Sequence, residues 1–135
     1  MSAGRMGRAV SLACVVISLS ACGGARAVDG GDATVLVAER TGGGMDARLE
    51  GTLAVVDGCL GITDVTTYRD TVVVWPHGTE VTSDAPTTIE LPGVGEIAVG
   101  EKVSVDGGVD RSTTGRVGGL VVPSYCDSTE IWLAR

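Results

Sequence analysis

The stretch Leu-Glu-Gly-Thr-Leu-Ala-Val-Val-Asp-Gly-Cys-Leu-Gly-Ile, residues 49–62, decides the fold of this chain. From Leu49 to Val55, every second position faces one side of an extended chain, and this period of two predicts a half-buried β-strand. Asp57-Gly58 is a two-residue hairpin signal. The apolar residues 59–62 then return as the second strand. The stretch therefore predicts a β-hairpin.

Short segments of the same kind follow toward the C-terminus. Residues 71–75 are β-branched and end at Pro76, after a polar loop at 64–70. Further strand candidates are 79–82, expected to pair back onto 71–75, then 88–91, 97–105 up to Gly107-Gly108, 120–122 and 129–134. None of these segments has a sustained helical period with caps. Five to seven short strands with glycines inside them predict an all-β fold, a strongly bent sheet or small barrel of the OB-like or SH3-like kind.

The region before the hairpin has a different composition. Residues 23–32 are rich in Gly, Ala and Asp and show no apolar period, and a run of three glycines at 42–44 interrupts the chain again. Between them, residues 33–39 are apolar enough for a short strand. We expect a flexible tether over 22–45 and a small β domain over 46–135.

The N-terminus has the pattern of an export signal. Arg5 and Arg8 precede an apolar run at 9–19. Eleven helical residues span about 16 Å, roughly half of a bilayer's hydrocarbon core. Residues 1–21 therefore read as a signal peptide rather than a transmembrane helix. No later segment reaches the ~20 apolar residues that a span needs.

The run ends in Leu19-Ser20-Ala21-Cys22, followed by two glycines. This closely resembles the lipobox of bacterial lipoproteins. The resemblance implies that the Cys22 thiol receives a diacylglyceryl group and that cleavage makes Cys22 the first residue of the mature protein. With more than one acyl chain, such as an added palmitate, anchoring is stable. The expected location is the extracytoplasmic face of the cell membrane.

Short pieces further along carry a second resemblance. They are Gly51-Thr-Leu, Cys59-Leu, Trp75-Pro76-x-Gly78-Thr79 and Val99-Gly100-x-x-Val103. The set resembles a pattern in small lipoproteins of high-GC Gram-positive bacteria that have no assigned activity. It implies an exported lipoprotein and supplies no catalytic residue.

Charge restricts the partners. The 10 basic residues less Arg5 and Arg8 leave 8 in the mature chain, against 17 acidic ones, for a formal charge of −9. An anionic bilayer repels such a chain, so the expected membrane contact is the lipid on Cys22. Nucleic acid is excluded as a partner because its binders present basic patches. An envelope protein or a glycan remains as the expected partner.

Two cysteines, Cys59 and Cys126, are left once Cys14 leaves with the signal and Cys22 carries lipid. In an exported protein an isolated pair predicts one disulfide; two free buried thiols are the alternative. A zinc site that also uses His77 is disfavoured because zinc takes three or four close-set ligands.

Residues that carry chemistry are few. His77 lies in a predicted turn, no serine sits in a Gly-x-Ser-x-Gly elbow, and Gly93–Ala98 matches a dinucleotide fingerprint but opens a strand. We therefore predict no catalytic residue, cofactor or metal, and a non-enzymatic binding or structural module. Two alternatives stay open: a cation- or glycan-binding β-barrel that uses Trp75 and Trp132 with acidic side chains, and a hydrolase that uses a carboxylate pair. The candidate pairs are Asp64 with Asp70 and Asp106 with Asp110.

Overall fold

The computed structural model describes residues 24–40, 45–111, 115–126 and 130–135. These residues form β-strands and one 3₁₀ turn, and they contain no α-helix. The predicted all-β class is therefore confirmed. The expected signal peptide, 1–21, and the expected lipidation site, Cys22, lie outside the described residues.

The described strands number twelve, more than the five to seven that the sequence predicted. They are β1 (Arg26–Asp29), β2 (Thr34–Val37), β3 (Ala47–Val56), β4 (Cys59–Asp64), β5 (Asp70–Trp75), β6 (Glu80–Asp84), β7 (Thr87–Leu91), β8 (Gly95–Ala98), β9 (Lys102–Asp110), β10 (Arg116–Val117), β11 (Leu120–Val121) and β12 (Ile131–Ala134). The 3₁₀ turn covers Ser124–Cys126.

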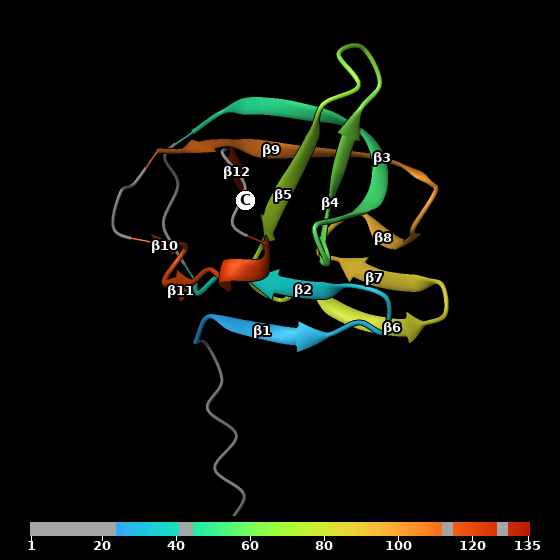
Figure 1. Ribbon diagram of the computed structural model, residues 1–135, viewed down its shortest axis with the longest axis horizontal. Helices are drawn as coiled ribbons and strands as arrows, with labels where there is room; N and C mark the ends of the chain where they lie inside the picture. The colour runs from blue at the N-terminus through green and yellow to red at the C-terminus, as the bar shows by residue number, and fades with distance from the viewer. Residues whose placement is uncertain (1–23, 41–44, 112–114, 127–129) are drawn as a thin grey trace, which may run out of the picture.

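Five strands close into a ring in the order β3-β4-β5-β12-β9 (Figure 1). The pairs within this ring are antiparallel except β5 and β12, which run parallel. Counted along the chain, the third of these five strands, β5, therefore lies beside the fifth, β12. This is the arrangement of an OB-like barrel, one of the two barrel kinds that the sequence predicted. The predicted hairpin forms the first two strands of the barrel, β3 and β4, which are joined by the turn at Asp57-Gly58.

The N-terminal segment corrects the sequence prediction. A tether was expected over 22–45, but β1 and β2 form an antiparallel pair there. β2 also pairs in parallel with β4 and β5, where those two strands diverge. Val35, Leu36 and Val37 are at most 2% exposed. β2 is buried on both faces and has no polar alternation, and it lies within the apolar segment 33–39 that the sequence offered as a possible short strand inside the tether. The ordered domain begins by Arg26.

Glycines allow strands of the ring to cross closely. A Cβ on Gly51, Gly61 or Gly107 would overlap a carbonyl oxygen of the neighbouring strand, that of Thr63, Thr71 or Leu133 respectively. The expectation that Gly107-Gly108 ends its strand is wrong, because β9 continues to Asp110. Gly107 is needed inside the strand, where β12 packs against it.

A three-stranded sheet, β6-β7-β8, joins β5 to β9. Residues 79–82 were expected to pair back onto β5, but β6 pairs with β7 instead. The physical reason is that both edges of β5 are occupied, by β12 on one side and by β4 and β2 on the other. Ile89, Leu91 and Ile97 of this sheet belong to the same hydrophobic cluster as the barrel interior.

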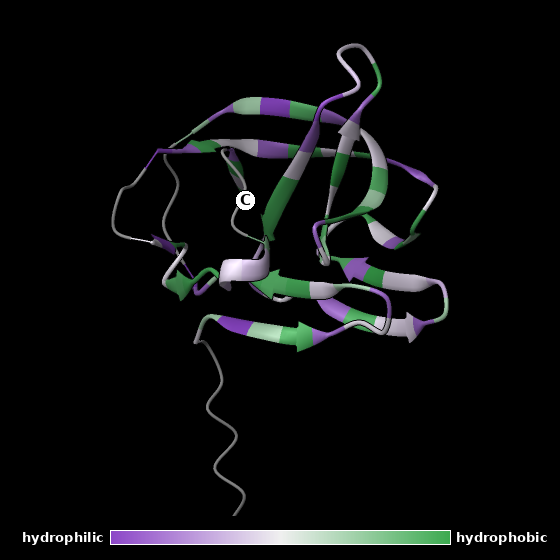
Figure 2. Cartoon of the chain, in the orientation of Figure 1, coloured by the Kyte–Doolittle hydropathy of each residue, from purple (hydrophilic) through white to green (hydrophobic). Residues whose placement is uncertain are grey.

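Two hydrophobic cores result. The first fills the barrel, with Leu53, Leu60 and Trp75 among its members. The second lies outside the barrel, between β2, β5 and β12 and a covering segment, residues 115–126, which we call the C-terminal flap. β2 and β5 contact both cores, and Figure 2 shows β2 and the half of β5 toward its arrowhead as hydrophobic, whereas β3 alternates.

Candidate binding surface at the β4–β5 loop

The outer face of β4 and β5 is covered in this protein. In OB-folds this face, formed by the second and third barrel strands, commonly binds ligands. Here Val72 and Val74 of β5 pack in the second core with Val117 and Leu120 of the C-terminal flap. Glu39 also donates its backbone N–H to the Gly118 carbonyl at 2.9 Å. The flap therefore covers the part of this face around Val72 and Val74, whereas Asp70, at the start of β5, stays exposed.

A disulfide fixes the flap. Cys59 at the start of β4 is joined to Cys126 at the end of the flap, with Cα atoms 5.6 Å apart. Both residues are fully buried. The pairing that the cysteine count predicted is therefore present in the structure. Beside it, the hydroxyls of Tyr125 and Thr34 form a hydrogen bond of 3.1 Å.

The β4–β5 loop, residues 65–69, projects from the barrel (Figure 1). Asp64 organises it. Its Oδ1 accepts the backbone N–H groups of Thr66 at 2.7 Å and Thr67 at 3.0 Å. Its own carbonyl accepts the Tyr68 N–H at 2.9 Å. The N–H of Thr67, and then that of Thr66, lower the pKa of the Asp64 carboxyl below its usual value because they stabilise the charged form.

Tyr68 is presented to solvent by this loop. Its φ is 55°, in the left-handed region that a bulky side chain seldom adopts. Its side chain is 81% exposed, the highest value among the exposed large hydrophobic residues of the described chain. Val65, at the other end of the loop, is 51% exposed. The backbone is thus held in a strained conformation while two apolar side chains face water.

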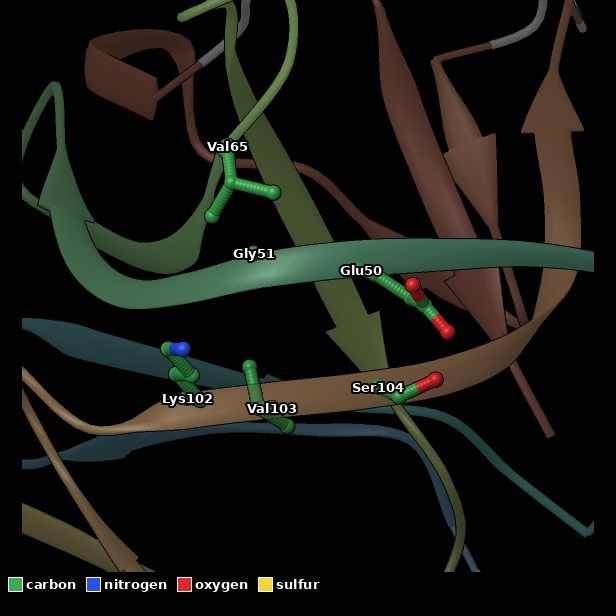
Figure 3. A pocket seen from close by; sticks show the side chains of 6 residues that line it. All are labelled: Glu50, Gly51, Val65, Lys102, Val103 and Ser104. Atoms are coloured by element: carbon green, nitrogen blue, oxygen red, sulfur yellow. The ribbon is translucent and has the colours of Figure 1, made fainter.

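One hollow adjoins the loop on the side of β3 and β9. It measures about 420 Å³. Val65 lies on one side of β3, and β9 lies on the other side (Figure 3). Its lining residues are Glu50, Gly51, Val65, Lys102, Val103 and Ser104. The hollow is thus an apolar patch with one acid, one base and one hydroxyl at its rim.

A second, smaller hollow of about 170 Å³ adjoins the other side of the loop. Thr67 and Arg69 of the loop line it together with Glu130 and Trp132. Trp132 is only 7% exposed. Its Nε1 is buried and has no hydrogen-bond partner among the described residues. The β4–β5 loop therefore separates two hollows that differ in chemistry.

The tryptophans are not a stacking platform. Trp75 is fully buried in the barrel, and its Nε1 donates to the Leu60 carbonyl at 3.2 Å. Trp132 is buried in the same core. The alternative that a sugar stacks on this pair is wrong for the folded barrel. Both side chains point inward because they occupy inward-facing strand positions.

The acidic pairs considered from the sequence serve the fold. Asp70 accepts a hydrogen bond of 2.6 Å from the Thr63 hydroxyl, next to the Asp64 cap. Asp106 is exposed and forms an ion pair of 3.3 Å with Arg48. Within the described ranges, no three His, Cys, Asp or Glu side chains are grouped to hold a metal. His77 lies half-buried in the turn between β5 and β6.

The sequence pattern predicts a polar loop at 64–70 and offers Asp64 with Asp70 as an acidic pair, but it does not single out Tyr68. A signal was available: Asp64 has Thr66 and Thr67 two and three positions after it, and an Asp in such a polar stretch favours an Asx-type turn, which fixes the backbone of a loop. Comparisons of the chain with protein-family models, curated proteins and solved structures found no match. In the part of the chain that the structure describes, no helix is long and apolar enough to cross a bilayer.

Proposed function

We propose that this protein is a lipid-anchored, non-enzymatic binding module of the bacterial cell envelope. Acylated Cys22 holds it at the extracytoplasmic face of the membrane. The β4–β5 loop, residues 65–69, contacts a protein partner through Tyr68 and Val65.

The observation that carries this proposal is the rigid display of Tyr68. An exposed aromatic side chain on a loose loop pays an entropic cost when it binds. The four hydrogen bonds that tie residues 64–69 together reduce that cost before any partner arrives. Tyrosine is among the residues most enriched at interaction hot spots.

The hollow beside Val65 supports the same assignment. Protein interfaces have an apolar centre and a polar rim. The loop supplies Tyr68 and Val65, and the adjoining hollow supplies the rim charges of Glu50 and Lys102. The covered β4–β5 face, in contrast, offers no open groove for an oligosaccharide or oligonucleotide.

The cellular location is supported by two independent features. The lipobox ending at Cys22 matches a lipoprotein signal at each of its four positions. The Cys59–Cys126 disulfide suits an oxidising, exported environment. The disulfide supports export in general, and the lipobox narrows the proposed location to the outer side of the cytoplasmic membrane.

Site-specific photo-crosslinking tests the proposal. A photoreactive phenylalanine analogue replaces Tyr68 in one strain and Tyr125 in a matched strain. Tyr125 is also exposed, at 59%, but it lies on the C-terminal flap. We expect a protease-sensitive adduct from position 68 only. Equal labelling from both positions, or no adduct from position 68, would contradict the proposal, and an adduct sensitive only to glycosidases would replace the protein partner with a glycan.

A further inference from the structure

We infer that the lipid on Cys22 holds the β1 side of the barrel against the bilayer and directs the β4–β5 loop away from it. This inference rests on the proposed lipid anchor. It adds two points to the proposed function: the surface of the domain that faces the membrane, and the orientation of the β4–β5 loop. Both follow from the position at which β1 begins.

Few residues separate the expected anchor from β1. β1 begins at Arg26, four positions after Cys22. Four residues, fully extended, span at most about 14 Å. A flexible tether over all of 22–45 would instead span roughly 27 Å on average and would permit any orientation. The early start of β1 therefore keeps the domain at the headgroup surface.

β1 is attached firmly enough to transmit this restraint. It pairs with β2 at each of its four residues. The Arg26 guanidinium donates to the Thr79 carbonyl at 3.3 Å. Asp29 caps the following turn by accepting the Gly31 N–H at 2.9 Å. Val28 packs against the barrel core.

The position of β1 in the fold sets the orientation. β1 and the turn after it lie at the opposite end of the molecule from the β4–β5 loop (Figure 1). With β1 next to the bilayer, the loop that carries Tyr68 therefore faces away from the lipid. A protein partner then reaches Tyr68 from the aqueous side.

The β1 face is polar, so it can lie at the surface of the bilayer without entering the hydrocarbon. Its exposed side chains include Arg26, Asp29 and Asp32, with Asp84 close by because its backbone lies against Gly31. None of the exposed large hydrophobic residues of the described chain lies in β1 or β2. Carboxylates outnumber the single arginine, so this face neither enters the acyl region nor attracts an anionic surface, and the short link to Cys22 is what holds it at the headgroups.

Fluorescence quenching from the bilayer surface tests the orientation. Single cysteines replace Asp32, in the β1–β2 turn, or Thr66, in the β4–β5 loop; both positions are exposed. In acylated protein, lipid occupies Cys22 and the disulfide occupies the other two cysteines, so the dye labels only the new thiol. Each labelled lipoprotein is reconstituted into phosphatidylcholine vesicles that carry a headgroup-attached quencher. We expect severalfold greater quenching for D32C than for T66C.

A longer tether supplies the matched control. Ten Gly/Ser residues inserted between Gly24 and Ala25 should reduce the difference between the two dyes because the domain then rotates freely. The orientation is overturned, and the anchor left intact, if protein without the insertion floats with the vesicles but D32C is quenched no more than T66C. Protein that does not float with the vesicles overturns the lipid anchor, and the orientation with it.

Discussion

Gly51 lies so close to the carbonyl oxygen of Thr63 that a side chain at position 51 would overlap it. At this point β3 pairs with two strands, through Asp64 on β4 and Val103 on β9. The first half of β3 pairs with β9 and the second half with β4, so β3 passes from one partner to the other at Gly51 and Thr52, and this change of partner lets the ring close. The absence of a Cβ at position 51 is therefore a condition for the barrel.

Gly51→Ala should destabilise the domain. Inserting a methyl group into a well-packed site typically costs about 1–3 kcal/mol, and the obstacle here is backbone, which yields less than a side chain. Urea unfolding followed by circular dichroism measures the loss. Gly24→Ala is the control, because nothing lies within 4 Å of a Cβ there. Equal free energies of unfolding for the two variants would show that the crossing tolerates a side chain.

Removing the disulfide should cost about 4 kcal/mol for cysteines 67 positions apart, on the chain-entropy account. We expect Cys59→Ala with Cys126→Ala to lower the urea midpoint and to raise amide exchange first in the C-terminal flap, residues 115–126. Alkylation followed by mass spectrometry supplies the second measurement. In the exported wild-type protein, neither thiol should be labelled before reduction, and free labelling of both would refute the pairing.

Asp64 should make the β4–β5 loop sensitive to acid. Its folded pKa is lowered, so its charged form contributes stability above its ordinary pKa. That contribution is lost as the pH falls from the ordinary pKa through the lowered folded value. Amide exchange of Thr66 and Thr67, followed by NMR, reports the loss directly.

Two substitutions separate the charge of Asp64 from its hydrogen bonds. Asp64→Asn keeps an acceptor oxygen and should lose the pH dependence but retain part of the protection. Asp64→Ala should lose both. If protection of Thr66 and Thr67 is unchanged in the alanine variant, another interaction holds the loop.

Cys22→Ala should release the protein from the membrane. Without a thiol to acylate, the chain should stay unprocessed or enter the aqueous phase of a Triton X-114 extraction. Its acidic surface offers no alternative attraction to an anionic bilayer. A Cys22→Ala variant that matures normally and still partitions into detergent would contradict the lipoprotein assignment.

The sequence predicted the fold well where local signals were strong. Asp57-Gly58 fixed the hairpin, and Pro76 marked the end of β5. The strand order was not predictable, because residues 120–134 carry no local sign that β12 pairs with β5. The segment 33–39 was apolar enough for a strand, but its place in the barrel could not be predicted, since its burial on both faces depends on partners far along the chain.

The candidate site was harder to predict than the fold. Trp75 and Trp132 were the obvious aromatic candidates, and the barrel uses both as core. Tyr68 was missed because its importance comes from exposure and a positive φ, which composition does not report. Asp64 was noted as an acid, but its role is to bind backbone amides.

The parallel contact between β5 and β12 also bears on how the chain folds. β12 is the strand that closes the ring, and it pairs with residues about 60 positions earlier in the chain, such as Val73 with Trp132. Contacts between segments so far apart slow folding, because a long loop must be ordered first. Until β12 arrives, the interior of the barrel stays open along one side. The core of the barrel is therefore complete only when the C-terminal strand has docked between β5 and β9.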